Sequence, residues 1–158
     1  MIRAAALGDA RAIAELEVRA WRWAYVDFVP DEDMPAVDDR EARWRTEPLE
    51  GAFVAEVEGR VVGVVRVGSD ADVAAGATAW LRGLYVEPAA QGGGLGGALH
   101  DHAVAELSAA GYADVTLDVF AANGHARAFY ERRGWASDGA TGDWAGLPGM
   151  RYRLRLRG

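Results

Sequence analysis

The chain has 158 residues, 51% of them apolar, which is enough for one globular domain that buries roughly 68–70% of its unfolded surface and excludes disordered or collagen-like proteins. With 24 acidic and 17 basic side chains, its formal net charge is −7, which disfavours binding to the phosphates of nucleic acids. The absence of cysteine excludes disulfides, thiolate metal sites and a cysteine acyl-enzyme.

The first part of the chain predicts an amphipathic helix. Ile13, Leu16 and Ala20 recur at helical spacing behind Asp9, a residue type that favours the N-cap position. Charged side chains interrupt the apolar residues from Arg3 onward, so this part lacks the continuous apolar run of a signal peptide. Nowhere does the chain approach the roughly 18 apolar residues that span a bilayer. We therefore expect a cytoplasmic protein that does not enter a membrane.

An acidic segment, residues 27–41, follows this helix. It holds seven acids and one base, Arg40, and it is interrupted by Pro30 and Pro35. Such a composition favours a loop or a broken pair of helices. The acids are Asp27, Asp31, Glu32, Asp33, Asp38, Asp39 and Glu41.

Three segments predict strands, and the first two are rich in β-branched residues. Residues 52–59 and 60–68 meet at a turn-length break that contains Gly59, as a tight antiparallel hairpin requires. The third segment, Ala79–Val86, is followed by Glu87 and a proline and leads toward a glycine-rich loop. The middle of the chain is therefore expected to build a sheet.

The glycine-rich loop QGGGLGG, residues 91–97, lies between the third strand and a helix that Gly111 ends. Apolar side chains recur every four residues along this helix, at Leu95, Leu99, Ala103 and Leu107. Glycine permits positive φ and close approach of a ligand, and a helix start presents unpaired N–H groups, so the loop suits a phosphate. A glycine-rich structural turn is the alternative.

The C-terminal part predicts two further strands around a short helix. Residues 114–120 read as a buried strand, and residues 123–133 as a helix that Asn123 caps and Gly134 ends. The last residues alternate between apolar and basic side chains, as in a half-buried strand. The basic ones are Arg151, Arg153, Arg155 and Arg157, either a solvated outer face or an anion-binding face. We expect one α/β domain over residues 1–158, with a mixed sheet.

The glycine loop matches two phosphate-binding patterns. Gly92, Gly94 and Gly97 satisfy G-x-G-x-x-G, and Asp118 follows at the distance of a ribose-binding acid in a dinucleotide fold. Too little chain follows Gly97 for the repeated βαβ units of such a fold, and a hairpin precedes the loop instead of parallel strands. A dinucleotide-dependent enzyme is therefore the less favoured hypothesis.

The competing pattern resembles the GNAT superfamily of acyl-CoA N-acyltransferases. It reads LYVEP, then Gln91-x-x-Gly94-x-Gly96, then N-x-x-A-x-x-F-Y-x-x-x-G-W from Asn123 to Trp135. The resemblance covers nearly the whole chain. It implies a mixed, mostly antiparallel sheet of about six or seven strands flanked by about four helices. It also implies a splay between the strands at residues 79–86 and 115–119.

The resemblance implies acetyl-CoA as the acyl donor. The glycine loop would hold the pyrophosphate through backbone N–H groups, and the pantetheine arm would pair with the strand that precedes it, like an added strand. Asn123 either contacts CoA or only caps its helix. The implied cofactor-binding residues are Leu84, Tyr85, Val86, Gln91, Gly92, Gly93, Gly94, Leu95, Gly96, Gly97, Asn123, Ala126 and Tyr130.

Tyr130 is the catalytic residue that the resemblance implies. Phe129 and Tyr130 are adjacent in a helix and point roughly 100° apart, so one packs and the other reaches the cleft. By resemblance Tyr130 lies near the CoA sulfur, where its hydroxyl protonates or hydrogen-bonds the leaving thiolate. The alternative is that Tyr130 only packs.

The acceptor side is less specified. Trp21 and Tyr25 resemble residues that line the acceptor pocket in relatives, although a pair at this spacing also suits a core. Trp80 stands near the position where many relatives carry a glutamate, so the base that deprotonates the acceptor is unassigned. Asp118 and Glu87 are the nearest carboxylates in sequence, each either structural or functional. We group Trp21, Tyr25, Trp80 and Asp118 as acceptor-binding candidates.

The expected function is acetyl transfer from acetyl-CoA to a primary amine by direct attack in a ternary complex. A catalytically degenerate, acyl-CoA-binding domain is the alternative. The acceptor is a small molecule or a peptide, and the acidic segment favours a cationic one unless it is merely solvated. We expect a monomer or homodimer without nucleic-acid partners. No metal site is expected, because His100, His102 and His125 lack ligand spacing.

Overall fold

The computed structural model describes residues 1–69, 78–144 and 146–156. Within these ranges the chain forms seven strands and four α-helices. The residues group into two compact units, which we describe separately. The first unit comprises Met1–Val67 and Gly83–Ala105, and the second comprises Gly68–Arg82 and Glu106–Gly158. The single domain expected over residues 1–158 stays a prediction.

The first unit is built on strands in the order β1, β2, β3 and the second half of β4. Their bounds are Ile2–Ala4, Ala52–Val57, Arg60–Gly68 and Thr78–Val86. β1 and β3 are both antiparallel to β2. Glu58 and Gly59 connect β2 to β3 with φ values of 52° and 76°, a turn whose positive φ angles match the twist of a hairpin. The predicted hairpin is therefore confirmed.

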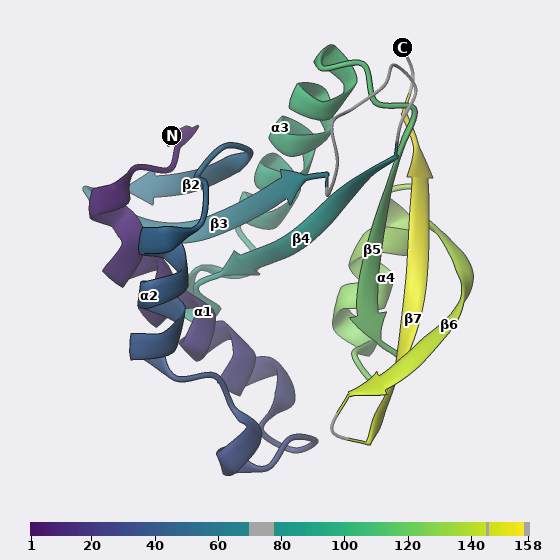
Figure 1. The fold of residues 1–158 in the computed structure, drawn as a ribbon, viewed down its shortest axis with the longest axis horizontal. Coiled ribbons are helices and arrows are strands. Elements are labelled where there is room, and N and C mark those ends of the chain that lie inside the picture. Colours follow the sequence, from purple (N-terminus) through teal and green to yellow (C-terminus); the bar gives the residue numbers. More distant parts are fainter. Residues whose placement is uncertain (70–77, 145, 157–158) are drawn as a thin grey trace. The chain divides into compact units, whose positions relative to one another are not determined.

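Two helices pack side by side in this unit, α1 (Ala10–Tyr25) and α2 (Val37–Thr46) (Figure 1). Ile13 and Leu16 of α1 are fully buried in a core cluster that also contains Trp44 of α2. The same cluster includes Val54 of β2 and Val64 of β3. The apolar face predicted for the first helix is thus the face that meets the sheet.

The second unit holds the first half of β4, then β5, β7 and β6. The bounds are Asp114–Phe120 for β5, Ala136–Trp144 for β6 and Leu147–Arg155 for β7. β4 and β5 pair in parallel over Thr78–Trp80, the N-terminal end of β4, while β5 and β6 are both antiparallel to β7. Figure 1 shows α4 (Gly124–Arg132) lying along β5 and β7. The mixed, mostly antiparallel sheet is confirmed.

Three local expectations need correction or completion. β1 and β6 were not expected: β1 has only three residues, and β6 (ASDGATGDW) is poor in β-branched residues and forms by pairing along β7. Asp9 stands at the N-cap position of α1, as expected, but its side chain makes no capping bond, because its carboxylate turns back to accept from the Ala6 N–H at 2.8 Å and from Arg3.

The acidic segment has the broken form expected for it. A short 3₁₀ turn covers Asp31–Asp33, and α2 begins only at Val37. No helix in the described part of the chain is long and apolar enough to cross a membrane.

Candidate functional site

The glycine loop leaves β4 through a 3₁₀ turn, Pro88–Ala90, and ends where α3 (Leu95–Ala109) begins. Gly92 and Gly94 have φ values of +87° and +83°, a conformation that side chains rarely adopt. A Cβ at either glycine would meet nothing within 4 Å. These two glycines are therefore required by the backbone conformation, and their outer side is open to a ligand.

The start of α3 supplies donors beside this loop. The Ala98 N–H donates to the Gly94 carbonyl at 3.0 Å, so the N–H groups of Leu95, Gly96 and Gly97 precede the first internal bond of the helix. The positive end of the helix dipole favours an anion here. Two left-handed glycines next to a helix start form an arrangement that fits a pyrophosphate.

Leu84, Tyr85 and Val86 end β4 immediately before this turn, in the same unit as the loop. The Tyr85 ring contacts the core cluster of the first unit. Its hydroxyl accepts a hydrogen bond from the Trp21 indole N–H at 3.2 Å, and the Trp21 and Tyr25 rings lie 4.5 Å apart between centroids. Trp21, Tyr25 and Tyr85 thus form one connected group, here called the aromatic group.

Glu17 is a buried acid that the sequence reasoning missed. Its side chain is on the core face of α1, one turn before Trp21, and the residue is 4% exposed. One carboxylate oxygen accepts from the Trp44 indole N–H and the other from Arg40 at 3.2 Å. Its position could have been recognised, because Ile13, Leu16, Glu17 and Ala20 occupy one helical stripe.

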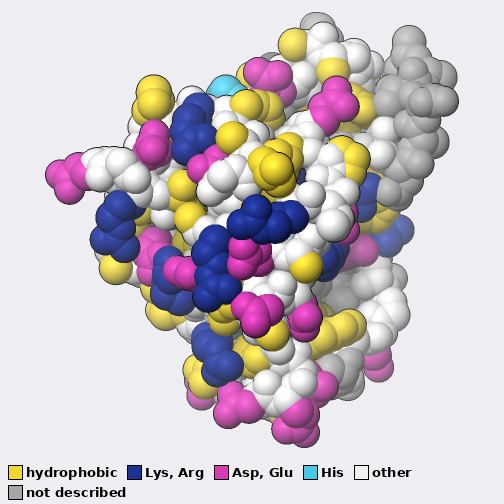
Figure 2. Space-filling model, turned by 60° about the vertical axis from the view of Figure 1, so that its left-hand side comes forward, with side chains coloured by type: hydrophobic (Ala, Val, Ile, Leu, Met, Phe, Trp, Pro, Cys, Tyr) yellow, Lys and Arg dark blue, Asp and Glu magenta, His cyan; other side chains and the backbone are white. Residues whose placement is uncertain are grey.

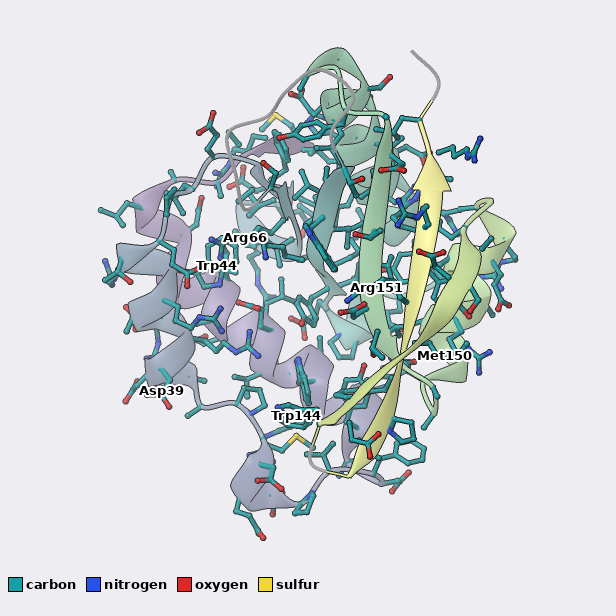
Figure 3. All side chains as sticks on the ribbon, turned by 45° about the vertical axis from the view of Figure 1, so that its right-hand side comes forward. Asp39, Trp44, Arg66, Trp144, Met150 and Arg151 are labelled. Carbon is teal, nitrogen blue, oxygen red and sulfur yellow. The ribbon has the colours of Figure 1, made fainter. Side chains whose placement is uncertain are left out.

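The surroundings of Glu17 determine its titration. Burial raises the pKa of the Glu17 carboxyl, opposed by the Trp44 hydrogen bond and by the charges of Arg40, Arg43 and Arg66. The guanidinium carbon of Arg66 lies 5.1 Å from the Trp44 ring centroid. Figure 3 labels both residues. Burial is the main cause that raises the pKa of the Tyr85 phenol, and the negative charge of Glu17 adds to it. The carboxylate of Glu17 is therefore close enough to Tyr85 to influence the titration of its phenol.

The second unit contains Tyr130 on α4. The residue is 8% exposed, and its ring lies edge-on to those of Phe129 and Trp135, at 5.2 Å and 5.5 Å between centroids. Phe129 is only half-buried and carries the Arg133 guanidinium 3.8 Å from its centroid. Tyr130 is thus the more buried of the two adjacent rings.

Asn123 caps α4, as expected. Its side-chain oxygen accepts from the Ala126 N–H at 3.0 Å, which satisfies one of the first donors of the helix. This hydrogen bond accounts for the presence of an asparagine at the start of α4.

The two carboxylates considered as bases are both ion-paired. Glu87 accepts from Arg19, with the shortest contact at 2.6 Å. Asp118 accepts from Nε and Nη2 of Arg151 at 2.8 and 3.1 Å. The guanidinium of Arg151 also lies 4.9 Å from the Trp80 ring centroid.

The acidic segment is partly neutralised. Asp31 pairs with Arg22 at 3.4 Å, and Asp38 pairs with Arg11 at 3.0 Å. Glu41 pairs with Arg45 at 2.7 Å. Figure 2 shows arginine and acidic side chains interspersed on this side of the molecule. Within the described ranges, no three His, Asp or Glu side chains gather in a way that could hold a metal ion.

The expected site residues divide between the two units. The first unit contains Trp21, Tyr25, Leu84–Val86 and the glycine loop, and the second contains Trp80, Asp118, Asn123, Ala126 and Tyr130. Each unit thus contains some of the expected site residues, and the aromatic group is the part of the first unit that direct contacts connect.

A family model matches most of the chain. The family model described as "Acetyltransferase (GNAT) family" matches residues 11–135. No curated protein matches the chain in sequence.

Solved structures resemble the chain over its full length. The ribosomal-protein-alanine N-acetyltransferase from Brucella melitensis has a TM-score of 0.77 and 23% identity, with 99% of both chains covered. PaiA N-acetyltransferase from Thermoplasma acidophilum, in complex with coenzyme A, has a TM-score of 0.75 and 17% identity, with 96% of both covered. YncA from Salmonella typhimurium, with acetyl-CoA, has a TM-score of 0.76 and 23% identity, covering 100% of this chain and 94% of that one. At these identities the likeness concerns the fold.

Proposed function

The chain belongs to the GNAT family of acetyltransferases, and on this premise we propose that it transfers an acetyl group from acetyl-CoA to a primary amine. The observation that carries the proposal is the glycine loop, where two left-handed glycines with open outer sides adjoin the start of a helix. This arrangement supports binding of the CoA pyrophosphate. The neighbours determined with coenzyme A or acetyl-CoA support the same donor.

The pantetheine arm pairs with the backbone of Leu84–Val86 in this proposal. Main-chain pairing of an extended ligand with a strand needs no particular side chain, and the loop follows this strand directly. The remaining cofactor contacts come from the glycine loop and from Asn123, Ala126 and Tyr130.

Tyr130 acts on the leaving thiolate. Its ring is held by Trp135 and Phe129, which fixes the direction of the hydroxyl. Proton donation from a positioned phenol lowers the barrier for departure of the CoA sulfur. The attack is direct, and the amine loses its proton to solvent or to a base that is not assigned.

The acceptor-binding candidates are Trp21 and Tyr25 in the first unit and Trp80 and Asp118 in the second. The acceptor is a small-molecule or peptide amine, and the acids not paired above extend a negative field that favours cationic acceptors. The cytoplasmic location and the monomeric or homodimeric state stay predictions.

A non-catalytic acyl-CoA-binding domain is the second candidate. Trp80, at the place where many relatives have a glutamate, favours it. A dinucleotide enzyme is disfavoured, because the antiparallel pairing of β5 and β6 with β7 does not suit a Rossmann sheet.

A ligand comparison tests the proposal. Acetyl-CoA is expected to raise the Tm of the full chain, while NAD and ATP leave it unchanged, because only a ligand bound to the folded state stabilises it. An amine panel with free-thiol detection then separates an enzyme from a binding domain. Stabilisation by NAD and not by acetyl-CoA would contradict the proposal. Stabilisation by acetyl-CoA without thiol release for any amine would favour the binding domain.

A further inference from the structure

Trp80, Asp118 and Arg151 form a cluster on one face of the sheet in the second unit. In the strand register, Trp80 is opposite Thr116 and Asp118 is opposite Arg151. Side chains alternate between the faces of a sheet, so residues two apart on β5 share a face. Three side chains from β4, β5 and β7 therefore meet on one surface, where Figure 3 labels Arg151.

The guanidinium of Arg151 is held in two ways. Its central carbon lies 4.9 Å from the Trp80 ring centroid, and Asp118 accepts hydrogen bonds from its Nε and Nη2 edge. The cation–π contact and the bidentate ion pair fix a side chain that is otherwise long and mobile. Ordering before ligand binding reduces the entropy lost on binding.

The ion pair with Asp118 does not occupy the Nη1–Nη2 edge of the Arg151 guanidinium. A side-on pair through Nε and Nη2 uses two of the five N–H donors, and the end formed by Nη1 and Nη2 has the fork geometry that matches a carboxylate. The Arg151 side chain is 38% exposed and that of Asp118 is 45% exposed, so a ligand can reach the cluster. An exposed ion pair of this kind contributes little to stability, so replacing Arg151 is expected to leave the fold intact.

We propose that Arg151 is a specificity-determining residue that binds a carboxylate of the amine acceptor, with Trp80 and Asp118 as its positioning residues. The inference rests on the proposed function, in which Trp80 is an acceptor-binding residue. It narrows the acceptor to an amine that also carries a carboxylate, such as an amino acid. This recognition acts in contact, and the acidic segment acts at long range through net charge, so the two effects are separable by salt.

The test compares each free α-amino acid of a panel with its own carboxamide, which keeps the amine and removes the carboxylate charge. Rates are measured by thiol release with acetyl-CoA at 0.5 M NaCl, a concentration chosen to screen long-range charge. For the wild type, kcat/KM is expected to be higher for the best amino acid than for its carboxamide. In Arg151→Gln this ratio should fall by about 10- to 100-fold, mainly through KM, because a charge-assisted bond is lost.

Two further variants make the test specific. Arg155→Gln removes the same charge from an exposed residue four positions along β7, on the same face, and should leave the ratio unchanged. Arg151→Lys keeps the positive charge but not the forked pair of N–H donors. The ratio of kcat/KM values should therefore fall less than in Arg151→Gln. Circular dichroism and stabilisation by acetyl-CoA verify that each variant is folded.

The outcomes are distinct. The inference is overturned if Arg151→Gln is folded and keeps the wild-type ratio. It is also overturned if Arg155→Gln loses as much of the ratio, because net charge alone would then determine the preference. If other amines are acetylated and amino acids are not, the inference fails while the proposed function stands. If acetyl-CoA neither binds nor reacts, the proposed function itself fails. Should Arg151→Gln not fold, the lysine variant decides between contact and charge.

Discussion

Tyr130 has a buried ring that packs and a hydroxyl to which we assign a role in catalysis. Because Phe lacks only the hydroxyl oxygen, one substitution separates the two roles. Tyr130→Phe keeps the edge-on contacts with Phe129 and Trp135 and removes only the hydroxyl. If the hydroxyl acts on the thiolate, kcat should fall by roughly 10- to 1,000-fold. Affinity for CoA should barely change. Single-turnover rates measure the chemical step, and equal rates in both proteins would mean that Tyr130 only packs.

Glu17 makes the stability of the protein depend on pH in an unusual direction. Burial raises its pKa above the ordinary value of 4.5, so between 4.5 and the raised pKa the folded state binds more protons than the unfolded state. The free energy of unfolding contributed by Glu17 therefore falls as pH rises through this window. Relative to Glu17→Gln, which does not titrate, the wild type should lose stability from pH 4 upward. Urea titrations at several pH values measure this difference.

Asp9 provides a control of opposite sign. Its hydrogen bond from Arg3 is the main cause that lowers the pKa of this carboxyl, so its stabilisation is present above the unfolded pKa and is lost as pH falls. The difference between the wild type and Asp9→Asn should therefore shrink toward low pH. For Glu17, the contrary outcome is that the free energies of unfolding of the wild type and of Glu17→Gln change in parallel with pH. This result would rule out a shifted pKa of Glu17.

At the scale of elements, we propose the junction of β4, the glycine loop and α3 as the donor site. Gly94→Ala forces a side chain into positive φ, which costs about 1–2 kcal/mol, and should weaken CoA binding by roughly 10-fold. Gly93→Ala is the comparison within the same loop. Gly93 is outside the left-handed region and its Cβ would meet only the Ala90 carbonyl at 3.6 Å, so its loss of affinity should be smaller than that of Gly94→Ala. Calorimetric titration with CoA measures both. Unchanged affinity in folded Gly94→Ala would remove the loop from the donor site.

The elements themselves differ in how far local sequence predicts them. The hairpin at Gly59 and the Asn123 cap follow from chemistry within a few residues, and both were predictable. β6 was not, because its residues have little strand preference and its form depends on pairing with β7. The position of Asp9 at the start of α1 was predictable as well, but its missing capping bond was not, since Arg3 and the Ala6 N–H bind its carboxylate instead.

At the scale of the whole molecule, charge and composition restrict the partners more than they identify them. A net charge of −7 argues against nucleic acid, and the pairing of Asp31, Asp38 and Glu41 with arginines reduces the field of the acidic segment. The family match from residue 11 to 135 includes parts of both compact units. The motif residues recognised in the sequence are therefore distributed over both.

The sequence by itself determined the family and predicted a donor site, because spacing along a chain is enough to place glycines at a loop, a cap at a helix start and a tyrosine on a helix. Only the tertiary structure decided the surroundings of Glu17 and Arg151. Glu17 meets Trp44 of another helix, and Arg151 meets Trp80 and Asp118 of two other strands. Such contacts join residues far apart in the chain, so packing and strand register create them, and no local pattern encodes either one.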